Sequence, residues 1–189
     1  MFTPETSIGT DGLLPTGTLA TAVIGIRGLK ESRNGGQYLD GEFTVTSPNY
    51  KGRKVFTNIM DPFFAGNSDG AKNMGKEAIS RALEGASLVD HADPSTYAPY
   101  GAGIMAVIDG LNSKEVPVEI VIEKGNEGFQ DKNAIKFLTP NPKSGCFIKW
   151  QRLQQDISGE NVETTSIGQS VSNPVTQSAP ATGTSLFKS

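Results

Sequence analysis

Residues 29–56 read LKESRNGGQYLDGEFTVTSPNYKGRKVF, and this stretch decides the fold. The NGG at residues 34–36 predicts a tight hairpin, because glycine, and less often asparagine, tolerates the positive φ angles that such turns need. The strand that follows alternates, with Leu39, Phe43 and Val45 on one face. Its other face carries polar and aromatic residues: Tyr38, Asp40, Glu42, Thr44 and Thr46. The stretch therefore predicts a hairpin that continues, after a short basic turn, into a third strand.

Outward from this stretch, the chain predicts three strands, a helix and two more strands. We expect strands at residues 19–29, 38–47, 52–59, 115–124 and 134–138. In the strand at 115–124 the alternation points Glu115, Glu119 and Glu123 away from the core. Such an acidic face would repel phosphates, so we do not expect a phosphate-binding surface there.

The helix expected at residues 71–84 has a cap, an apolar stripe and an end. Ser68 or Asp69 can cap it and Gly85 can end it. The apolar stripe consists of Met74, Ala78, Ile79, Ala82 and Leu83. A second short helix is expected at 104–111. We predict a mainly β fold with one or two helices, a five-stranded OB-like barrel with its helix between strands three and four.

The composition of the 189 residues predicts one domain with a flexible segment at each end. Residues 1–16 are rich in Thr, Gly and Pro, and we expect a flexible lead-in there. Residues 17–153 hold the expected OB-like domain. Residues 154–189 contain few large apolar side chains, so we expect a disordered tail. Its end regains hydrophobicity at Leu186 and Phe187, which is either a short docking motif or a plain frayed terminus.

Charge and cysteine content exclude several classes of protein. The net charge is −3, but residues 15–152 are close to neutral and the two ends carry the remaining negative charge. The single cysteine, Cys146, excludes an internal disulfide and any zinc site built from several thiolates. The sequence has neither a secretory-signal pattern at its start nor an apolar run near the ~20 residues of a membrane span. We expect a soluble, intracellular protein.

Cations and aromatic residues gather in the loops that grip a ligand in an OB barrel. The loops Lys30–Gln37 and Lys124–Asn133 would join strands one to two and four to five, and each combines cations with a nearby aromatic ring. Single-strand binding needs rings that stack on bases and cations that follow phosphates. The candidate nucleic-acid-binding residues are Lys30, Arg33, Tyr38, Tyr50, Lys51, Arg53, Lys54, Phe56, Lys124, Phe129 and Lys132. For each residue alone, core packing or a solvated surface charge is the alternative interpretation.

Patterns typical of catalysis are weak in this sequence. Gly101–Ala106 fits a dinucleotide-binding GxGxxA, but the Pro-rich segment before it is not the buried strand that the motif requires. His91 lies between Asp90 and Asp93, which a polar loop explains as well as a metal site does. Neither a GxSxG elbow nor a P-loop occurs, and Cys146 sits in an apolar context. We expect no enzyme activity, no catalytic residues, no metal site and no cofactor.

Four short pieces, in this order, resemble a phage-encoded family of uncharacterised proteins: NGGQYLDGEFTV, YKGRKVF, MGKEAISRALEGA and GFQDKNAIKFL. The resemblance covers residues 27–138. Members of this family are found among recombination and replication functions and are described as similar to single-stranded-DNA-binding proteins. The resemblance implies an OB-like fold, single-stranded-DNA binding and a place in the cytoplasm of the infected bacterial host. The tail departs from the acidic tip common in such binders, because it ends in Leu186, Phe187, Lys188 and Ser189.

Three functional hypotheses follow. The first is single-stranded-DNA binding in phage replication or recombination, through phosphate contacts and base stacking without sequence specificity. The alternative is a non-enzymatic interaction protein that uses the same barrel to bind protein partners. The third is an accessory subunit of a phage recombinase or nuclease, which would bind DNA poorly alone. Independently of this choice, the tail is the expected docking segment for a phage recombinase, nuclease or polymerase partner. The sequence leaves open whether the chain forms a homo-oligomer.

Overall fold

The computed structural model describes residues 12–125 and 130–159, and these residues form a mainly β fold. Five strands build one sheet: β1 (Thr18–Glu31), β2 (Gln37–Val45), β3 (Lys54–Met60), β4 (Glu115–Glu123) and β5 (Lys132–Phe137). Three α-helices accompany them: α1 (Asp69–Gly85), α2 (Ile104–Leu111) and α3 (Phe147–Ser158). Two 3₁₀ segments, η1 (Pro48–Tyr50) and η2 (Pro94–Ala102), lie in the connections. The expected mainly β class is confirmed, but the expectation of one or two helices was wrong.

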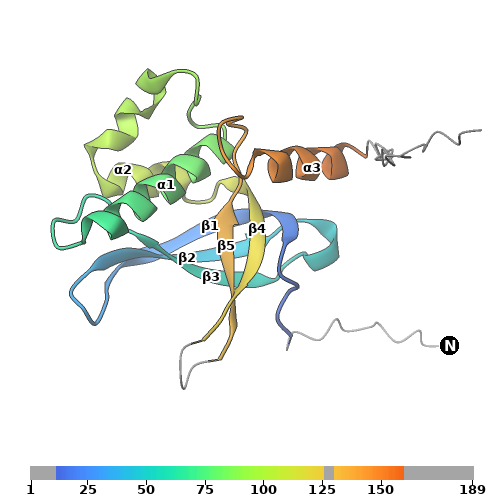
Figure 1. Cartoon of the computed structure of the whole chain (residues 1–189), viewed down its shortest axis with the longest axis horizontal. Coiled ribbons are helices and arrows are strands. Elements are labelled where there is room, and N and C mark those ends of the chain that lie inside the picture. Colours follow the sequence, from blue (N-terminus) through green and yellow to red (C-terminus); the bar gives the residue numbers. More distant parts are fainter. Residues whose placement is uncertain (1–11, 126–129, 160–189) are drawn as a thin grey trace, which may run out of the picture.

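The sheet is antiparallel throughout, in the order β3-β2-β1-β4-β5. β4 and β5 cross the direction of β2 and β3 steeply, so the sheet is strongly twisted (Figure 1). The twist brings the two outermost strands together, and the backbone N–H of Ile135 on β5 donates to Thr57 Oγ1 on β3 at 2.8 Å. Each of these two strands is separated from β1 by one antiparallel neighbour, so β3 and β5 have the same sense as β1 in the sheet.

The alternation of the β2 segment is confirmed, since Leu39, Phe43 and Val45 are fully buried. Gly41 lies between them on the same inward face. A Cβ atom at this position would lie 2.8 Å from the ring of Phe43, so glycine leaves the room that the ring needs. The inward face of β2 is therefore filled by large side chains packed around one glycine.

Helix α1 packs on the sheet at the position predicted for the helix. Ser68 caps it by accepting a hydrogen bond from the N–H of Ala71. Its inward stripe includes Ile79 and Leu83, whereas Met74 is 68% exposed. Gly75 faces the sheet instead, so closely that a Cβ there would lie 2.1 Å from the carbonyl oxygen of Met60. The predicted stripe was wrong at its first residue, because the close approach needs a glycine there.

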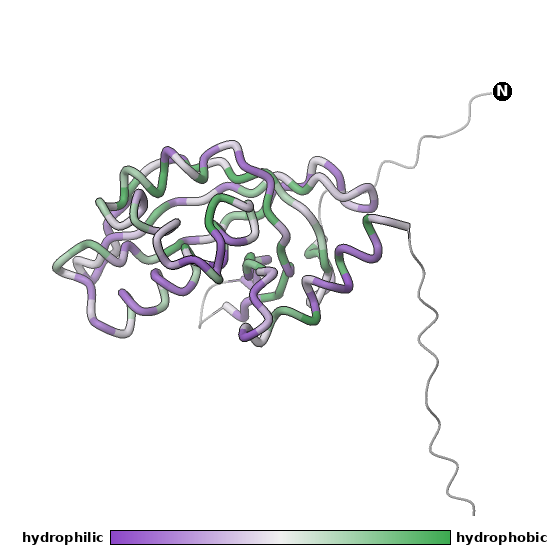
Figure 2. The backbone as a smooth tube through the Cα atoms, turned by 90° about the horizontal axis from the view of Figure 1, so that it is seen from above, coloured by the Kyte–Doolittle hydropathy of each residue, from purple (hydrophilic) through white to green (hydrophobic). Residues whose placement is uncertain are grey.

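Helix α3 covers part of β4, which the sequence did not predict. Hydrophilic and hydrophobic residues alternate along this helix (Figure 2), and Leu153 is its buried contact. Lys149 Nζ lies 2.7 Å from both carboxylate oxygens of Glu119. Glu119 is only 8% exposed, so the expectation that it points into solvent was wrong. The side of β4 that carries Glu119 is therefore partly covered by a helix, and the charge of Glu119 is paired.

Structured residues also lie on both sides of residues 17–153, the range expected for the domain. Leu14, in the expected lead-in, is 3% exposed, and its backbone N–H and carbonyl both bond to the amide of Asn133. Helix α3 continues to Ser158, beyond the boundary expected at residue 153. Residues 160–189 of the expected tail lie outside the described residues. In the described ranges, no helix combines the length and apolar character needed to cross a bilayer.

Candidate nucleic-acid interface

The outward side chains of β1, β2 and β3 form a continuous surface, which we call the outer face. Residues directly opposite each other in an antiparallel pair project from the same side of a sheet. Lys30, Tyr38 and Met60 lie opposite one another across the three strands. Glu42 lies opposite Phe56 in the same way. The outer face carries the aromatic, cationic and acidic residues Arg27, Lys30, Tyr38, Asp40, Glu42, Lys54 and Phe56.

Phe56 is the exposed ring of this face. Its side chain lies on β3 and the residue is 45% exposed. The guanidinium carbon of Arg27 lies 4.7 Å from the ring centroid, within the range of a cation–π contact. An exposed ring with an arginine against it is a flat platform of the kind on which a nucleic-acid base stacks.

Asp40 holds two cations on the outer face. Its Oδ1 lies 2.6 Å from Arg27 Nη2, and its Oδ2 lies 2.5 Å from Lys30 Nζ. The Asp40 side chain is only 5% exposed beneath these cations. The hydrogen bond from Arg27, followed by that from Lys30, holds the pKa of the Asp40 carboxyl below its ordinary value. Asp40 is therefore an ionised anchor that fixes where Arg27 and Lys30 lie.

Glu42 pairs with the remaining cation of the outer face. Its Oε1 lies 2.6 Å from Lys54 Nζ, and the Glu42 side chain keeps 24% of its exposure. Lys54 lies two residues before Phe56 on the same face of β3, and its side chain is 55% exposed. The pair thus combines a solvent-accessible carboxylate with a solvent-accessible ammonium group next to the aromatic platform.

An open groove of about 600 Å³ adjoins the outer face. It lies between the start of β3, the loop from β4 to β5 and the segment before β1. Its lining consists of Gly12, Leu13, Arg53, Lys54, Val55, Phe56, Gln130, Asp131, Lys132 and Asn133. The guanidinium of Arg53 donates to the carbonyl oxygen of Gly12. The β3 residues and the loop between β4 and β5 therefore meet at one groove.

The cations of the β4–β5 loop are also paired. Lys124 Nζ lies 2.6 Å from Asp131 Oδ2, and the Lys124 bond is the largest cause of a lowered pKa at Asp131. Lys132 Nζ lies 3.3 Å from Glu123 Oε2. Phe129 lies outside the described residues. Of these two paired cations, Lys132 lines the groove and Lys124 does not.

The predicted site residues separate into three groups. The outer face brings together Lys30, Tyr38, Lys54 and Phe56, and the groove adds Arg53 and Lys132. Tyr50 packs against the core, and Lys51 is exposed in the turn before β3. Arg33 is exposed in the β1–β2 hairpin, which extends beyond the rest of the sheet (Figure 1).

Arg27 is the interface residue that sequence reasoning missed. A register shift between Ile26 and Gly28 interrupts the pairing of β1 with β2. Such an irregularity changes which side chains share a face, so alternation counted along the strand cannot place Arg27. Its contacts with Asp40 and Phe56 become visible only in the folded sheet.

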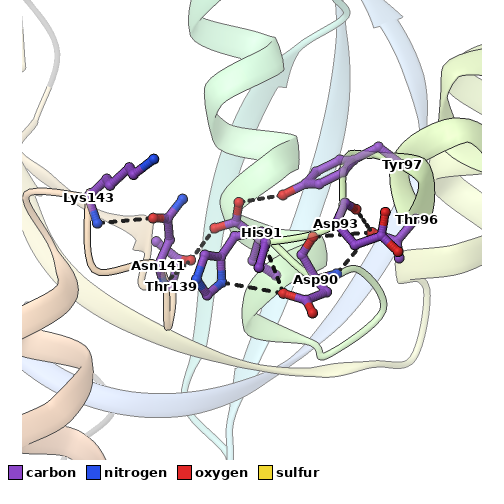
Figure 3. A network of polar contacts seen from close by, with 10 residues as sticks. Asp90, His91, Asp93, Thr96, Tyr97, Thr139, Asn141 and Lys143 are labelled. Atoms are coloured by element: carbon purple, nitrogen blue, oxygen red, sulfur yellow. Dashed lines mark hydrogen bonds and ion pairs between the residues drawn. The ribbon is translucent and has the colours of Figure 1, made fainter.

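A second polar cluster lies away from this face, around the buried carboxylate of Glu84 (Figure 3). The hydroxyls of Tyr97 and Thr139 donate to its two oxygens. Burial is the main cause of a raised pKa at Tyr97, with the bond to Glu84 second. Both carboxylate oxygens already have protein partners, so this cluster joins α1, η2 and the segment after β5.

The loop around His91 has a structural explanation. The Asp90 carboxylate accepts from the N–H of Ala92, and the Asp93 carboxylate accepts from the N–H and hydroxyl of Ser95. These bonds stabilise turns in the loop. Within the described ranges, no three His, Cys, Asp or Glu side chains gather as a metal site. The GxGxxA segment begins in the last two residues of η2 and runs into α2 rather than following a strand, so it lacks the context of a dinucleotide site.

The outer face and the groove together present an exposed aromatic ring, cations and the carboxylates paired with them. This combination can hold a polyanion that carries flat rings. Neither a protein-family model nor a curated protein matches this chain, so the interpretation rests on the residues themselves.

Proposed function

We propose that this protein binds single-stranded DNA along the outer face and the adjoining groove, without reading its sequence. The observation that carries the proposal is the 45% exposed ring of Phe56, with Arg27 stacked against it and Lys54 on the same face. Base–aromatic stacking tolerates any sequence, because every base has a π face. Cations beside the ring attract the phosphates on either side of a stacked base.

The strand order supports the finer proposal that the sheet is an OB-type barrel. Following the neighbours around gives β1-β2-β3-β5-β4, and the Ile135–Thr57 bond joins the outermost strands. Helix α1 lies between β3 and β4, which is where the OB barrel has its helix. In that fold the strand 2–3 face and the loops between strands 1–2 and 4–5 bind oligonucleotides. The strands of the outer face and the β4–β5 loop residues of the groove support this proposal, because they belong to the elements that bind ligands in that fold.

The biological setting of the proposal comes from the sequence resemblance alone. We propose that the protein acts in phage replication or recombination, in the cytoplasm of the infected host. A phage recombinase, nuclease or polymerase is the proposed protein partner, through the C-terminal tail. No enzyme activity of its own forms part of the proposal.

A protein-binding role is the second candidate, and exposed apolar side chains favour it. Ile148 is 71% exposed on α3, and Ile157 on the same helix is 57% exposed. These side chains suit a protein partner better than a phosphate backbone. Salt separates the two candidates, because DNA affinity falls steeply with salt through counterion release, whereas an apolar contact does not.

The direct test compares two phenylalanines of equal exposure. Phe63, in the loop before α1, is 44% exposed and lies outside the outer face. Fluorescence anisotropy of a labelled dT oligonucleotide, roughly 16 nucleotides long, gives the affinity of each variant. We expect Phe56→Ala to weaken binding by about 1–3 kcal/mol, the value of one stacked base, and Phe63→Ala to leave it unchanged. Equal losses in both variants, or no binding by the unmodified protein at low salt, would contradict the proposal.

A further inference from the structure

We infer that Glu42 acts as an internal competitor for the DNA phosphate, and thereby sets the affinity and salt dependence of the outer face. This inference rests on the proposed function. Its basis is a contrast between the two carboxylates of the face, Asp40 and Glu42, which differ in burial and in the number of cations that they hold.

Glu42 pairs with Lys54, the cation that the proposed site needs most for binding a phosphate. Lys54 is the cation that both lies on the face of Phe56 and lines the groove. Glu42 lies directly opposite Phe56 and bonds to Lys54 at 2.6 Å. A phosphate next to a base stacked on Phe56 would approach this ammonium group, where a carboxylate already lies. The two anions therefore compete for one cation.

Burial decides that Glu42, and not Asp40, is the exchangeable carboxylate. The Asp40 side chain is 5% exposed and lies between two cations, so its displacement would leave a covered charge without its partners. Glu42 is 24% exposed and holds one lysine that is itself 55% exposed. Ion pairs of this exposed kind are weak, so a phosphate can take over the lysine. The released carboxylate then stays beside the phosphate and repels it.

Glu77 offers a matched control elsewhere in the chain. It is also a glutamate in an ion pair with one cation, Arg81, one turn further along α1. Changing it to glutamine removes the same charge from the protein but frees no cation on the outer face. A difference between the two glutamine variants therefore reports the position of the charge and not the net charge.

The experiment measures anisotropy of the labelled dT oligonucleotide against salt for the unmodified protein, Glu42→Gln and Glu77→Gln. We expect Glu42→Gln to tighten binding severalfold and to steepen the slope of log affinity against log salt by about 0.7, the value of one more phosphate contact on a single strand. Glu77→Gln should match the unmodified protein. In a Lys54→Ala background the gain from Glu42→Gln should be clearly smaller, because the substitution then relieves only the repulsion between carboxylate and phosphate and frees no cation.

The outcomes separate this inference from the function on which it rests. If the unmodified protein binds with the expected dependence on Phe56, but Glu42→Gln behaves like Glu77→Gln, the inference fails and the proposed function stands. A gain of the same size in the Lys54→Ala background also overturns the inference, because the effect would then be general electrostatics and not competition for Lys54. If no variant binds the oligonucleotide at any salt, the proposed function fails and the inference fails with it.

Discussion

At the scale of single residues, Asp40 organises the interface. Its carboxylate bonds to Arg27 and Lys30, and Arg27 in turn stacks on Phe56. A neutral side chain at this position would hold the two cations less firmly, because the attraction between opposite charges would be lost. The position of the aromatic platform therefore depends on a residue that is itself nearly covered.

The lowered pKa of Asp40 predicts a pH dependence of stability. A carboxyl whose pKa is lower in the folded protein stabilises it above the ordinary value of 3.8, and this contribution is lost as the pH falls through the folded value. We expect Asp40→Asn to lower the melting temperature at about pH 7, and the difference from the unmodified protein to shrink below about pH 4. Thermal melts across this range measure both effects. Asp109→Asn, an exposed site on α2, serves as control, and a constant Asp40→Asn difference at all pH values would contradict the account.

The alternation in the sequence correctly predicted which β2 side chains are buried. It did not predict which cations pair with the side chains on the opposite face. It placed Leu39, Phe43 and Val45 in the core, which the structure confirms. It also put Asp40 and Glu42 on the opposite face from these three residues. It could not assign their cations, because these come from β1 and β3 and depend on the register and on the irregularity near Gly28.

At the scale of elements, α3 is the helix that changes the expected surface most. It lies against β4 and brings Lys149 to the covered carboxylate of Glu119. Phe147, Trp150 and Leu153 recur every three residues, although no helix at these positions is among the elements expected from the sequence. Such spacing is helical, and the rings of Phe147 and Trp150 stack with centroids 5.8 Å apart. The sequence is mostly polar from Gln154 onward, so its composition did not indicate that the helix continues for another turn.

The contact between α3 and β4 gives a stability prediction. We expect Lys149→Ala to lower the free energy of unfolding by about 1–2 kcal/mol, because it leaves a largely covered carboxylate without its cation. Arg152→Ala in the same helix, at an exposed position, removes the same charge and is the control. Urea denaturation gives both values. Equal effects of the two substitutions would mean that the Glu119 pair contributes nothing to stability.

At the scale of the whole molecule, the contact between β3 and β5 joins two strands that lie far apart in the sequence. The hydrogen bond from Ile135 to Thr57 joins the strand of the aromatic platform to the strand that follows the β4–β5 loop. The order of three strands, a helix and two further strands could be predicted from the sequence, and the structure has this order, with α3 in addition. The bond itself could not be predicted, because it depends on how far the sheet twists.

Removing this bond should loosen the junction between the two strands. We expect Thr57→Val to lower the free energy of unfolding by about 1 kcal/mol and to speed hydrogen exchange at the amide of Ile135, which loses its acceptor. Thr44→Val on β2 is the control, since no hydrogen bond of its hydroxyl joins two strands in the described structure. Unchanged exchange at Ile135 would show that the hydroxyl does not hold the strands together.

The most direct test of the central claim is an NMR titration of the ¹⁵N-labelled full chain with a dT oligonucleotide at low salt. The account predicts that amide signals of β2, β3 and residues 130–133 shift together, that they return towards their free positions as salt is added, and that α2 stays unperturbed. No shifts at all, or shifts confined to the helices, would contradict the claim that the outer face and its groove bind single-stranded DNA.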